Sequence, residues 1–475
     1  MNTGIKKGSE LELEIESLAF GAKGVAKVDG FVVFVPSTIP GQRVRALITR
    51  KRKGHAEARP LAVVRQSPDF VLPRCRHFED CGGCATQDYA YEKQLAAKRR
   101  QVAEVLAHLG GFKDVEVYNT LPSPQQFFYR NKMEFTFSRQ RWLTKHEIQS
   151  QAEVGDKSFA LGLHARGRFD KSIDITECWL LSETSNRILD VVRQATKNHS
   201  LIPYSTHDHT GFWRFLVIRE GKQTGELMVN VVTNAAPDGN AAVDELSSRL
   251  IGEVPGISTI VHNINRSKAQ IAFGEEEHVL HGPGYLHDRI GSYTFRISAN
   301  SFFQTNTLGA EQLYKTALDF AGLQGDEVVY DLYSGAGTIS SFVSSHARRV
   351  IGFEIVQEAV KDAQVNCQIN QVSNCEFVAG DLKDHLSPDS AIARWGKPDV
   401  VIADPPRAGL HPKVVKRLLE LAPPRLVYVS CNPATFARDL KELCASQYRL
   451  EKIQPVDMFP HTAHCEVVGS LNRIG

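Results

Sequence analysis

The stretch EVVYDLYSGAG, residues 327–337, decides the fold of the C-terminal part of this chain. An apolar run typical of a buried strand ends there in a turn with Gly335 and Gly337, and a helical pattern follows. Similar apolar runs recur later, separated by helical patterns, at residues 348–355, 375–381, 398–406 and 425–432. Short buried strands that alternate with helices predict a parallel, doubly wound sheet.

The last two strand patterns of the chain have no helical pattern between them. They are YRLEKIQPVDMF (448–459) and CEVVGSLNR (465–473). Because parallel strands need a long crossover connection, two strands joined without a helix are expected to pair antiparallel. The C-terminal part is therefore predicted to be an α/β domain with an antiparallel hairpin at one edge of its sheet.

The turn after the first strand predicts a ligand site, because sheets of this kind bind ligands at the carboxyl ends of their strands. Glu354 ends the second strand, where a carboxylate can accept hydrogen bonds from both ribose hydroxyls of a nucleoside ligand. Asp381 ends the third strand, a suitable place to contact the edge of that ligand's adenine. The turn lacks the third glycine of dinucleotide sites, and no phosphate-anchoring GK[ST] motif is present. An adenosyl ligand without phosphates fits best.

Asp404-Pro405-Pro406-Arg407 ends the fourth strand. Each proline fixes its own φ, so an irregular loop is expected beside the ligand. Many amino-group methyltransferases have an aromatic residue after this Pro-Pro pair, which can stack on the target base. Here the residue is Arg407, which could contact an RNA phosphate or form a structural salt bridge.

Cys431 ends the fifth strand, in Ser430-Cys431-Asn432-Pro433. A lone cysteine in a strand is usually a small buried hydrophobe. This one lies at the ligand-facing end of its strand, and a helix beginning near Pro433 is expected to favour the thiolate through its dipole. A thiolate can add to C6 of a pyrimidine and so enable C5 to take a methyl group from a sulfonium. A general base must then remove the C5 proton.

The N-terminal part predicts a small β-barrel that faces a polyanion. Residues 9–64 form short strand patterns punctuated by glycines, as in oligonucleotide-binding barrels. Arg50-Lys51-Arg52-Lys53 is expected between the last two strands, where it can follow a phosphate backbone or simply keep a hairpin tip soluble. Residues 1–110 carry 18 Lys+Arg against 12 Asp+Glu, although the whole chain has a net charge of only +2.

Three cysteines follow the predicted barrel. Cys75, Cys81 and Cys84 have ligand-like spacing, and Cys178 is one candidate among several for the fourth ligand of a metal site. The spacing alone leaves zinc and an iron–sulfur cluster open. The cysteines without such spacing are interpreted as packing residues: Cys367, Cys375, Cys444 and Cys465.

Composition excludes several classes of protein. Nine cysteines in 475 residues are too few, and odd in number, for a disulfide scaffold, so a reducing, cytoplasmic setting is expected. No stretch approaches the roughly 18 apolar residues of a membrane span, and the N-terminus has no apolar signal region. After an amphipathic helix at 90–109, residues 111–295 read as mixed α/β structure.

Four motifs, in order, resemble those of the RNA uridine-5 methyltransferases. They are DLYSGAG, DPPRAGL, SCNPATFARDL and DMFPHTAHCEVV. Residues 5–64 resemble the TRAM domain, an RNA-binding barrel, and RumA-type members that act on 23S rRNA have this domain and a cysteine-ligated iron–sulfur cluster. The resemblance implies four parts: a TRAM barrel (1–64), a cysteine segment with a helix (65–110), a central α/β domain (111–295) and a Rossmann-like methyltransferase domain (296–475).

The resemblance also implies roles for individual residues. Cys431 would attack C6, and Glu466 in HCEVV would remove the C5 proton. Thr338 stands where some members have asparagine, so that contact is not carried over. The positions that match the S-adenosylmethionine site are Gln304, Tyr333, Glu354 and Asp404. The positions that match the ligands of a [4Fe-4S] cluster are Cys75, Cys81, Cys84 and Cys178. Since methyl transfer needs no electron donor, such a cluster is expected to be structural or to shape bound RNA.

The resulting expectation is a monomeric, cytoplasmic enzyme that makes 5-methyluridine in 23S rRNA. Bacterial tRNA enzymes of the family typically lack the barrel and the cluster, which makes tRNA the second choice. A noncatalytic RNA-binding factor would have lost the nucleophile or the base, and both are present. RNA cytosine-5 methyltransferases typically have a cysteine in the Asp-Pro-Pro region, where this chain has Arg407.

Overall fold

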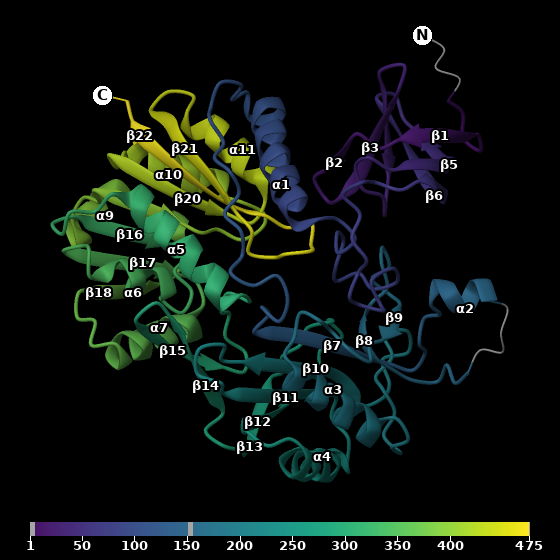
Figure 1. Cartoon of the computed structure of the whole chain (residues 1–475). Coiled ribbons are helices and arrows are strands. Elements are labelled where there is room, and N and C mark those ends of the chain that lie inside the picture. The colour runs from purple at the N-terminus through teal and green to yellow at the C-terminus, as the bar shows by residue number, and fades with distance from the viewer. Residues whose placement is uncertain (1–4, 151–154, 475) are drawn as a thin grey trace.

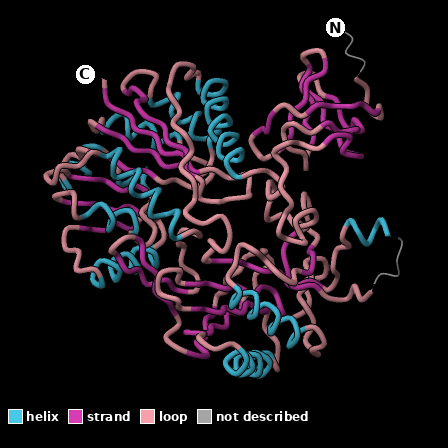
Figure 2. The backbone as a smooth tube through the Cα atoms, viewed as in Figure 1, coloured by secondary structure: helices cyan, strands magenta, loops and turns pink. Residues whose placement is uncertain are grey.

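The computed structural model describes residues 5–150 and 155–474. Three groups of strands and helices follow one another along the chain and lie around a common centre (Figure 1). Figure 2 shows that strands alone form the N-terminal group, whereas helices flank the sheets of the other two. Within the described ranges, no helix has both the length and the apolar character needed to cross a membrane.

The N-terminal group is a six-stranded sheet in the order β1-β5-β6-β4-β3-β2. Its strands are β1 (Glu10–Glu14), β2 (Ser17–Ala19), β3 (Lys23–Val28), β4 (Phe31–Val35), β5 (Arg43–Lys51) and β6 (His55–Arg65). Alternate side chains such as Val33, Val44 and Ala46 are fully buried, as expected for a sheet with one face toward its core. The four cations at 50–53 lie at the β5–β6 turn, where the sequence placed them.

A helix then connects this sheet to the C-terminal part of the chain. Helix α1 (Tyr91–Val105) continues into a π-helical turn, η1 (Leu106–Gly110), and confirms the helix expected at 90–109. Its buried residues Val102 and Leu106 belong to the same apolar core as the strands and helices of the C-terminal sheet. Helix α1 therefore covers the edge of the C-terminal sheet (Figure 1).

The central sheet is mixed and has seven strands, in the order β13-β12-β11-β10-β7-β8-β9. They are β7 (Lys132–Ser138), β8 (Ala160–His164), β9 (Ser172–Asp174), β10 (Trp213–Glu220), β11 (Leu227–Thr233), β12 (Ile257–Ile264) and β13 (Glu276–His281). Only the β11–β12 pair is parallel. The helices of this part are α2 (Lys145–Ser150), α3 (Glu183–Thr196) and α4 (Gly239–Glu253). Apolar residues of α3 and α4 share a core with the sheet.

A hairpin and a helix lead into the C-terminal domain. The hairpin is β14 (Tyr285–Ile290) and β15 (Tyr293–Ser298), and the helix is α5 (Thr307–Ala321). Phe295 of the hairpin and Leu313 of α5 are fully buried in one core with the C-terminal sheet. This packing fixes the loop between them, residues 299–306, against that sheet.

The C-terminal sheet has the order β18-β17-β16-β19-β20-β22-β21. Its strands are β16 (Val328–Leu332), β17 (Arg349–Glu354), β18 (Cys375–Ala379), β19 (Val400–Ala403), β20 (Arg425–Ser430), β21 (Tyr448–Val456) and β22 (Glu466–Arg473). The first five are parallel, and β22 pairs antiparallel with both β20 and β21. The predicted Rossmann-like sheet with its antiparallel edge hairpin is confirmed.

The remaining helices flank this sheet. They are α6 (Thr338–Ser344), α7 (Gln357–Ile369), α8 (Leu382–His385), α9 (Pro388–Trp395), α10 (Pro412–Leu421) and α11 (Pro433–Leu443). From β16 the next strands in sequence, β17 and β18, lie to one side, whereas β19 and β20 lie to the other. The connections that leave β16 and β19 therefore run in opposite directions. A crevice at the carboxyl ends of the strands is the usual ligand site of such a sheet.

Candidate active site and cysteine cavity

The turn after β16 has the backbone of a ligand cradle. Tyr333 has φ +65°, and Gly335 and Gly337 have φ +52° and +74°. Left-handed backbone at a bulky tyrosine is costly and occurs mostly at functional sites, where the surroundings enforce it. One enforcing contact comes from Glu354 at the end of β17, whose carboxylate accepts a hydrogen bond of 3.0 Å from the Gly335 N–H.

Two buried polar atoms beneath this turn have no partner. Within residues 5–150 and 155–474, Oδ1 of Asp331 and Oγ of Ser334 form no hydrogen bond. The other oxygen of Asp331 accepts a hydrogen bond of 2.6 Å from Ser340, and burial raises the pKa of Asp331 to about 7. Since a buried polar atom normally has a partner, the turn fits a polar ligand.

The Glu354 and Asp381 carboxylates differ in how many of their hydrogen-bonding positions are occupied by the protein itself. Glu354 accepts one hydrogen bond on each oxygen, the second from the Val356 N–H at 2.9 Å, and keeps further lone pairs for ribose hydroxyls. The Asp381 side chain caps α8 through the Lys383 N–H and pairs with the Lys383 ammonium at 2.8 Å. Of the two carboxylates, Glu354 is therefore the one that lies against the glycine turn.

The side chains of Gln304 and Asp404 meet at the carboxyl edge of the sheet. Gln304 lies in the loop before α5, and its Nε2 is 3.5 Å from Oδ2 of Asp404, which follows β19. Burial raises the pKa of Asp404 to about 7. The residues matched to the cofactor site thus come from the loop before α5 and from the ends of β16, β17 and β19, all at the carboxyl edge of the sheet.

Strand pairing places Cys431 next to Glu466. Ser430, the last residue of β20, is paired with Val467 of β22, so the residues that follow and precede them are neighbours. Glu466 is only 5% exposed. Its pKa is raised to about 8, mainly by burial and also by the nearby Asp404 carboxylate, and Arg407 opposes both. A carboxylate with a raised pKa is a stronger base than an ordinary glutamate.

The thiolate expected at Cys431 is not favoured in the free protein. Helix α11 begins at Pro433 as predicted, and the Asn432 side chain caps it. The pKa of Cys431 is nevertheless raised to about 11, mainly by burial and also by the Glu466 carboxylate, whereas Arg407 opposes this shift. Loss of hydration and a neighbouring negative charge therefore outweigh the helix terminus.

Arg407 belongs to the same cluster and forms no salt bridge among the residues described. Its backbone carbonyl accepts hydrogen bonds from the Asn432 side chain at 3.1 Å and from Thr435 at 3.3 Å, which tie the Asp-Pro-Pro loop to the turn of Cys431. Its exposed guanidinium lies 3.4 Å from the His464 ring. The alternative of a structural salt bridge is thus not what the structure shows.

The four cysteines from two distant segments line one cavity. Cys75, Cys81, Cys84 and Cys178 surround about 570 Å³ together with side chains such as Met133 and Leu163. The pKa of Cys75 is raised to about 11 and those of Cys81 and Cys84 to about 12, mainly by burial and in part by the nearby Cys178. The structure thus places Cys178, which was one candidate among several from spacing and was matched to the fourth ligand by the family resemblance, beside the other three.

No group of three or more His, Cys, Asp or Glu side chains in the described ranges is arranged to hold a single metal ion. One zinc ion would lie about 2.3 Å from each of its sulfurs. In a four-iron cube each thiolate binds a different iron, so the sulfurs need not converge on one point. The cavity and its thiol set therefore fit a cluster in their chemistry.

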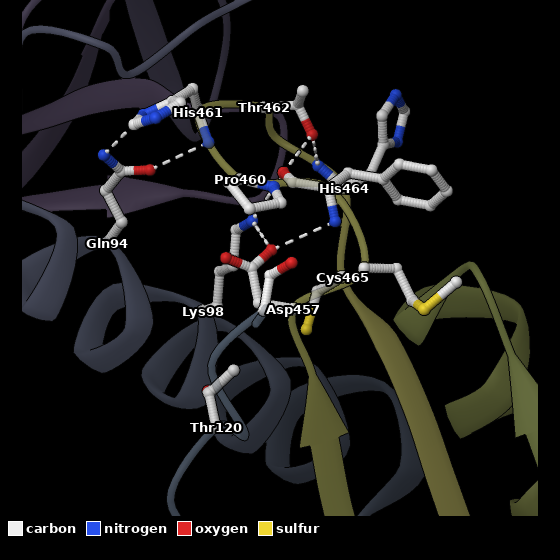
Figure 3. Close-up of polar contacts among 12 residues, drawn as sticks. Gln94, Lys98, Thr120, Asp457, Pro460, His461, Thr462, His464 and Cys465 are labelled. Carbon is white, nitrogen blue, oxygen red and sulfur yellow. Dashed lines mark hydrogen bonds and ion pairs between the residues drawn. The ribbon is translucent and has the colours of Figure 1, made fainter. Parts of the chain in front are cut away.

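The sequence reasoning missed a buried network beside the active site. Lys98 of α1 forms an ion pair of 2.6 Å with Asp457, and Tyr91 donates a hydrogen bond of 2.9 Å to the same carboxylate. Figure 3 shows Lys98 and Gln94 of α1 directed toward the chain around His461. The partners are separated by about 360 residues, which no local pattern reveals. The one available signal was a lysine on the apolar stripe of a predicted helix.

Comparison with known proteins identifies relatives over the whole chain. Residues 248–474 match the model of the tRNA (uracil-5-)-methyltransferase family, and residues 5–61 match the TRAM domain. A protein of Porphyromonas gingivalis described as an RNA methyltransferase is 44% identical, over 97% of this chain and 99% of its own. One from Chlorobaculum tepidum is 42% identical, over 98% and 97%.

A solved structure is also similar. It is the tRNA (uracil-54, C5)-methyltransferase of Pyrococcus abyssi in complex with S-adenosyl-L-homocysteine. Sequence identity is 31%, the match covers 97% of this chain and all of that chain, and the TM-score is 0.72. The likeness extends over so much of this chain that it includes most of the N-terminal sheet.

Proposed function

This chain belongs to the family of S-adenosylmethionine-dependent RNA uridine-5 methyltransferases, and from that premise we propose that it methylates C5 of a uridine in 23S ribosomal RNA. The observation that carries the proposal is the meeting of Cys431 and Glu466 at the carboxyl edge of the C-terminal sheet. Asp404 and Gln304 lie beside them, where the methyl donor is expected.

In the proposed reaction, Cys431 acts first as the nucleophile and Glu466 acts last as the base. The Cys431 thiolate adds to C6 of the uracil, and the electron pair of the C5–C6 double bond becomes available at C5. C5 takes the methyl group from the sulfonium of S-adenosylmethionine, which leaves as S-adenosylhomocysteine. Glu466 then removes the C5 proton, and the electrons of that bond restore the double bond as the thiolate leaves C6.

The surroundings of Cys431 define how the nucleophile is generated. A thiol with a pKa of about 11 is protonated at neutral pH, so substrate binding has to favour its deprotonation. Arg407 already lowers this pKa, and a sulfonium cation bound nearby would act in the same direction. Glu466, with a pKa of about 8, is also mostly protonated at neutral pH. Arg407 and a bound sulfonium would favour its carboxylate form too, and both protons would pass to solvent before Cys431 adds to C6.

We further propose that Cys75, Cys81, Cys84 and Cys178 hold a [4Fe-4S] cluster with a structural role. The support is the shared cavity, the burial of all four thiols and their mutual effects on pKa. Deprotonated sulfurs in this apolar setting need cations beside them, which the irons would supply. The chain's own residues then perform the methyl transfer without a redox step.

The choice of 23S rRNA rests on the barrel together with the cysteine cavity. The similar Pyrococcus abyssi protein favours tRNA as a second candidate, because a tRNA enzyme matches this chain over 97% of its length. A barrel alone therefore does not separate the two substrates. We also propose that the enzyme is monomeric and cytoplasmic, in keeping with nine free cysteines.

Mapping of 5-methyluridine in cells that lack this protein tests the substrate. We expect one or more uridines of 23S rRNA to lose their methyl group completely, and purified protein with S-adenosylmethionine to restore it on the extracted RNA. The tRNA of the same cells is the internal control and is expected to keep its 5-methyluridine. Loss confined to tRNA would establish the second candidate instead.

Replacement of three exposed cations at the β5–β6 turn by glutamine tests the barrel as an RNA contact. For the triple variant of Arg50, Arg52 and Lys53, the slope of log affinity against log salt should fall by about 2 to 3, because each lost phosphate contact removes about 0.7 to 0.9. The matched control replaces exposed cations elsewhere: Lys416, Lys441 and Arg449. Equal slopes for the two triple variants would contradict an RNA contact at this turn.

A further inference from the structure

The segment that connects β21 to β22, residues 457–465, ends at Glu466. Among the described residues, the Glu466 carboxylate accepts no hydrogen bond, and the groups that act on it do so through charge. No side chain therefore holds the carboxylate in place. The antiparallel pairing of Glu466 with Val456 and the backbone of the 457–465 segment, which joins these two strands, together set its position.

Helix α1 holds the start of this segment. Lys98 and Asp457 form a buried ion pair of 2.6 Å, with side chains 5% and 0% exposed. The Lys98 ammonium also donates to the Phe459 carbonyl at 3.1 Å, and Asp457 accepts a hydrogen bond from the Phe459 N–H at 3.2 Å. One buried cation thus fixes both ends of a tight bend (Figure 3).

His461, in the middle of the segment, contacts three other parts of the chain. Its φ is +65°, a strained value for a residue other than glycine. Its N–H donates to the Gln94 side chain at 3.1 Å, and its carbonyl accepts from the Ala85 and Thr86 N–H groups at 2.7 and 3.1 Å. The Phe127 ring lies 4.4 Å from the imidazole, centre to centre. These contacts enforce the strained backbone.

The donors to His461 follow Cys84 directly in the sequence. Two backbone hydrogen bonds therefore tie the cysteine-bearing chain, residues 75–87, to the 457–465 segment, so the backbone position of one affects that of the other. Tyr129, from the loop before β7, adds a hydrogen bond of 3.1 Å to the Pro460 carbonyl. The segment is thus braced by α1, by the cysteine-bearing chain and by the loop that leads to β7.

We propose that Lys98, Asp457 and His461 are positioning residues for the base step, because the bracing of the 457–465 segment places the Glu466 carboxylate at the C5 proton. The inference rests on the proposed role of Glu466. Under this inference, α1 and the cysteine-bearing chain affect the rate of the base step although no residue of either contacts the reacting atoms. A displacement of about 1 Å at a catalytic group can cost on the order of 100-fold in rate.

Lys98→Met is the first test variant. Methyl transfer precedes the base step, so the labelled methyl group should still reach the RNA, while release of the adduct should slow about 10- to 100-fold. The measurement uses labelled S-adenosylmethionine, total RNA from cells that lack the protein, and denaturing gels that follow the covalent band with time. Because methyl transfer precedes the slowed step, kcat/KM for S-adenosylmethionine should stay unchanged while kcat and KM fall together, and no contact with Gln304, Glu354 or Asp404 is altered.

Two further variants guard against loss of folding. The double variant Lys98→Met with Asp457→Leu removes the whole ion pair without leaving a buried charge, a replacement that proteins often tolerate. Tyr91→Phe is a milder change, which removes the hydrogen bond that Tyr91 donates to Asp457 and the one that its hydroxyl accepts from the Ser123 N–H. Lys222→Met is the matched control, because it breaks a partly buried ion pair of 2.8 Å with Glu220, which ends β10 of the central sheet.

The outcomes separate this inference from the proposed function. A persistent adduct for Glu466→Gln, with slow release for the Lys98 variants and normal release for Lys222→Met, supports the inference. Normal release by Glu466→Gln would refute the base role itself. The inference would be overturned, with the base role intact, if Glu466→Gln gave a persistent adduct while the folded Lys98 variants released the adduct at the wild-type rate. If neither Lys98 variant folds, wild-type release by Tyr91→Phe would overturn it in the same way.

Discussion

Cys431→Ala is expected to abolish methylation and the covalent bond to RNA, with a loss of roughly 10⁴-fold or more in rate. A methyl side chain cannot add to C6, so C5 never becomes able to take the methyl group. The measurement is transfer of labelled methyl to RNA, together with a denaturing gel that detects the protein–RNA band. Cys444→Ala, at a half-buried cysteine that ends α11, is the matched control and should methylate normally.

Glu466→Gln should stop the same reaction at a later point. Glutamine keeps the shape of the buried side chain but cannot take the C5 proton. The adduct that carries the methyl group should therefore form and persist, visible as a labelled protein–RNA band that Cys431→Ala never shows. Methylation by Cys431→Ala, or normal turnover by Glu466→Gln, would show that the assigned roles are wrong.

Cys178→Ser should remove the metal from the purified protein. Protein prepared without air should be brown and contain about four irons per chain, because a complete cube has four iron atoms with one thiolate on each. Serine at 178 leaves one iron without its thiolate in a buried cavity, so we expect the visible absorption and nearly all the iron to be lost. Iron analysis and the absorption spectrum measure this directly.

The control for Cys178→Ser is Cys444→Ser, which replaces a cysteine outside the cavity and should keep iron and colour. Stoichiometric zinc in a colourless wild-type protein would contradict the cluster. Such a result would leave the methyl transfer chemistry untouched, since Cys431 and Glu466 lie at the edge of a different sheet.

Periodicity alone was sufficient for much of the fold. The five apolar runs became β16 to β20, and the two strand patterns without a helix between them became the antiparallel pair β21 and β22. Local patterns succeed here because a parallel strand covered on both faces is a nearly continuous apolar run, which is a property of neighbouring residues. The cysteine spacing and the glycine turn are local in the same sense.

The protonation states of the active site depended on tertiary structure. The sequence predicted a thiolate at Cys431 from a nearby helix start, which is a local feature. The structure buries the thiol beside Glu466, a residue 35 positions later in the chain, and its pKa rises instead. Burial and charge depend on every segment that packs around a group, and no window of sequence contains them.

Local patterns in the sequence were enough to predict the strands of the C-terminal sheet, the family motifs and the candidate catalytic residues Cys431 and Glu466. The contacts of Lys98 with Asp457, of Ala85 and Thr86 with His461, and of Glu466 with the end of β20 became visible in the folded chain alone. The physical reason is distance along the chain. Secondary structure follows from residues a few positions apart, whereas the position of a catalytic group follows from contacts between segments that only folding brings together.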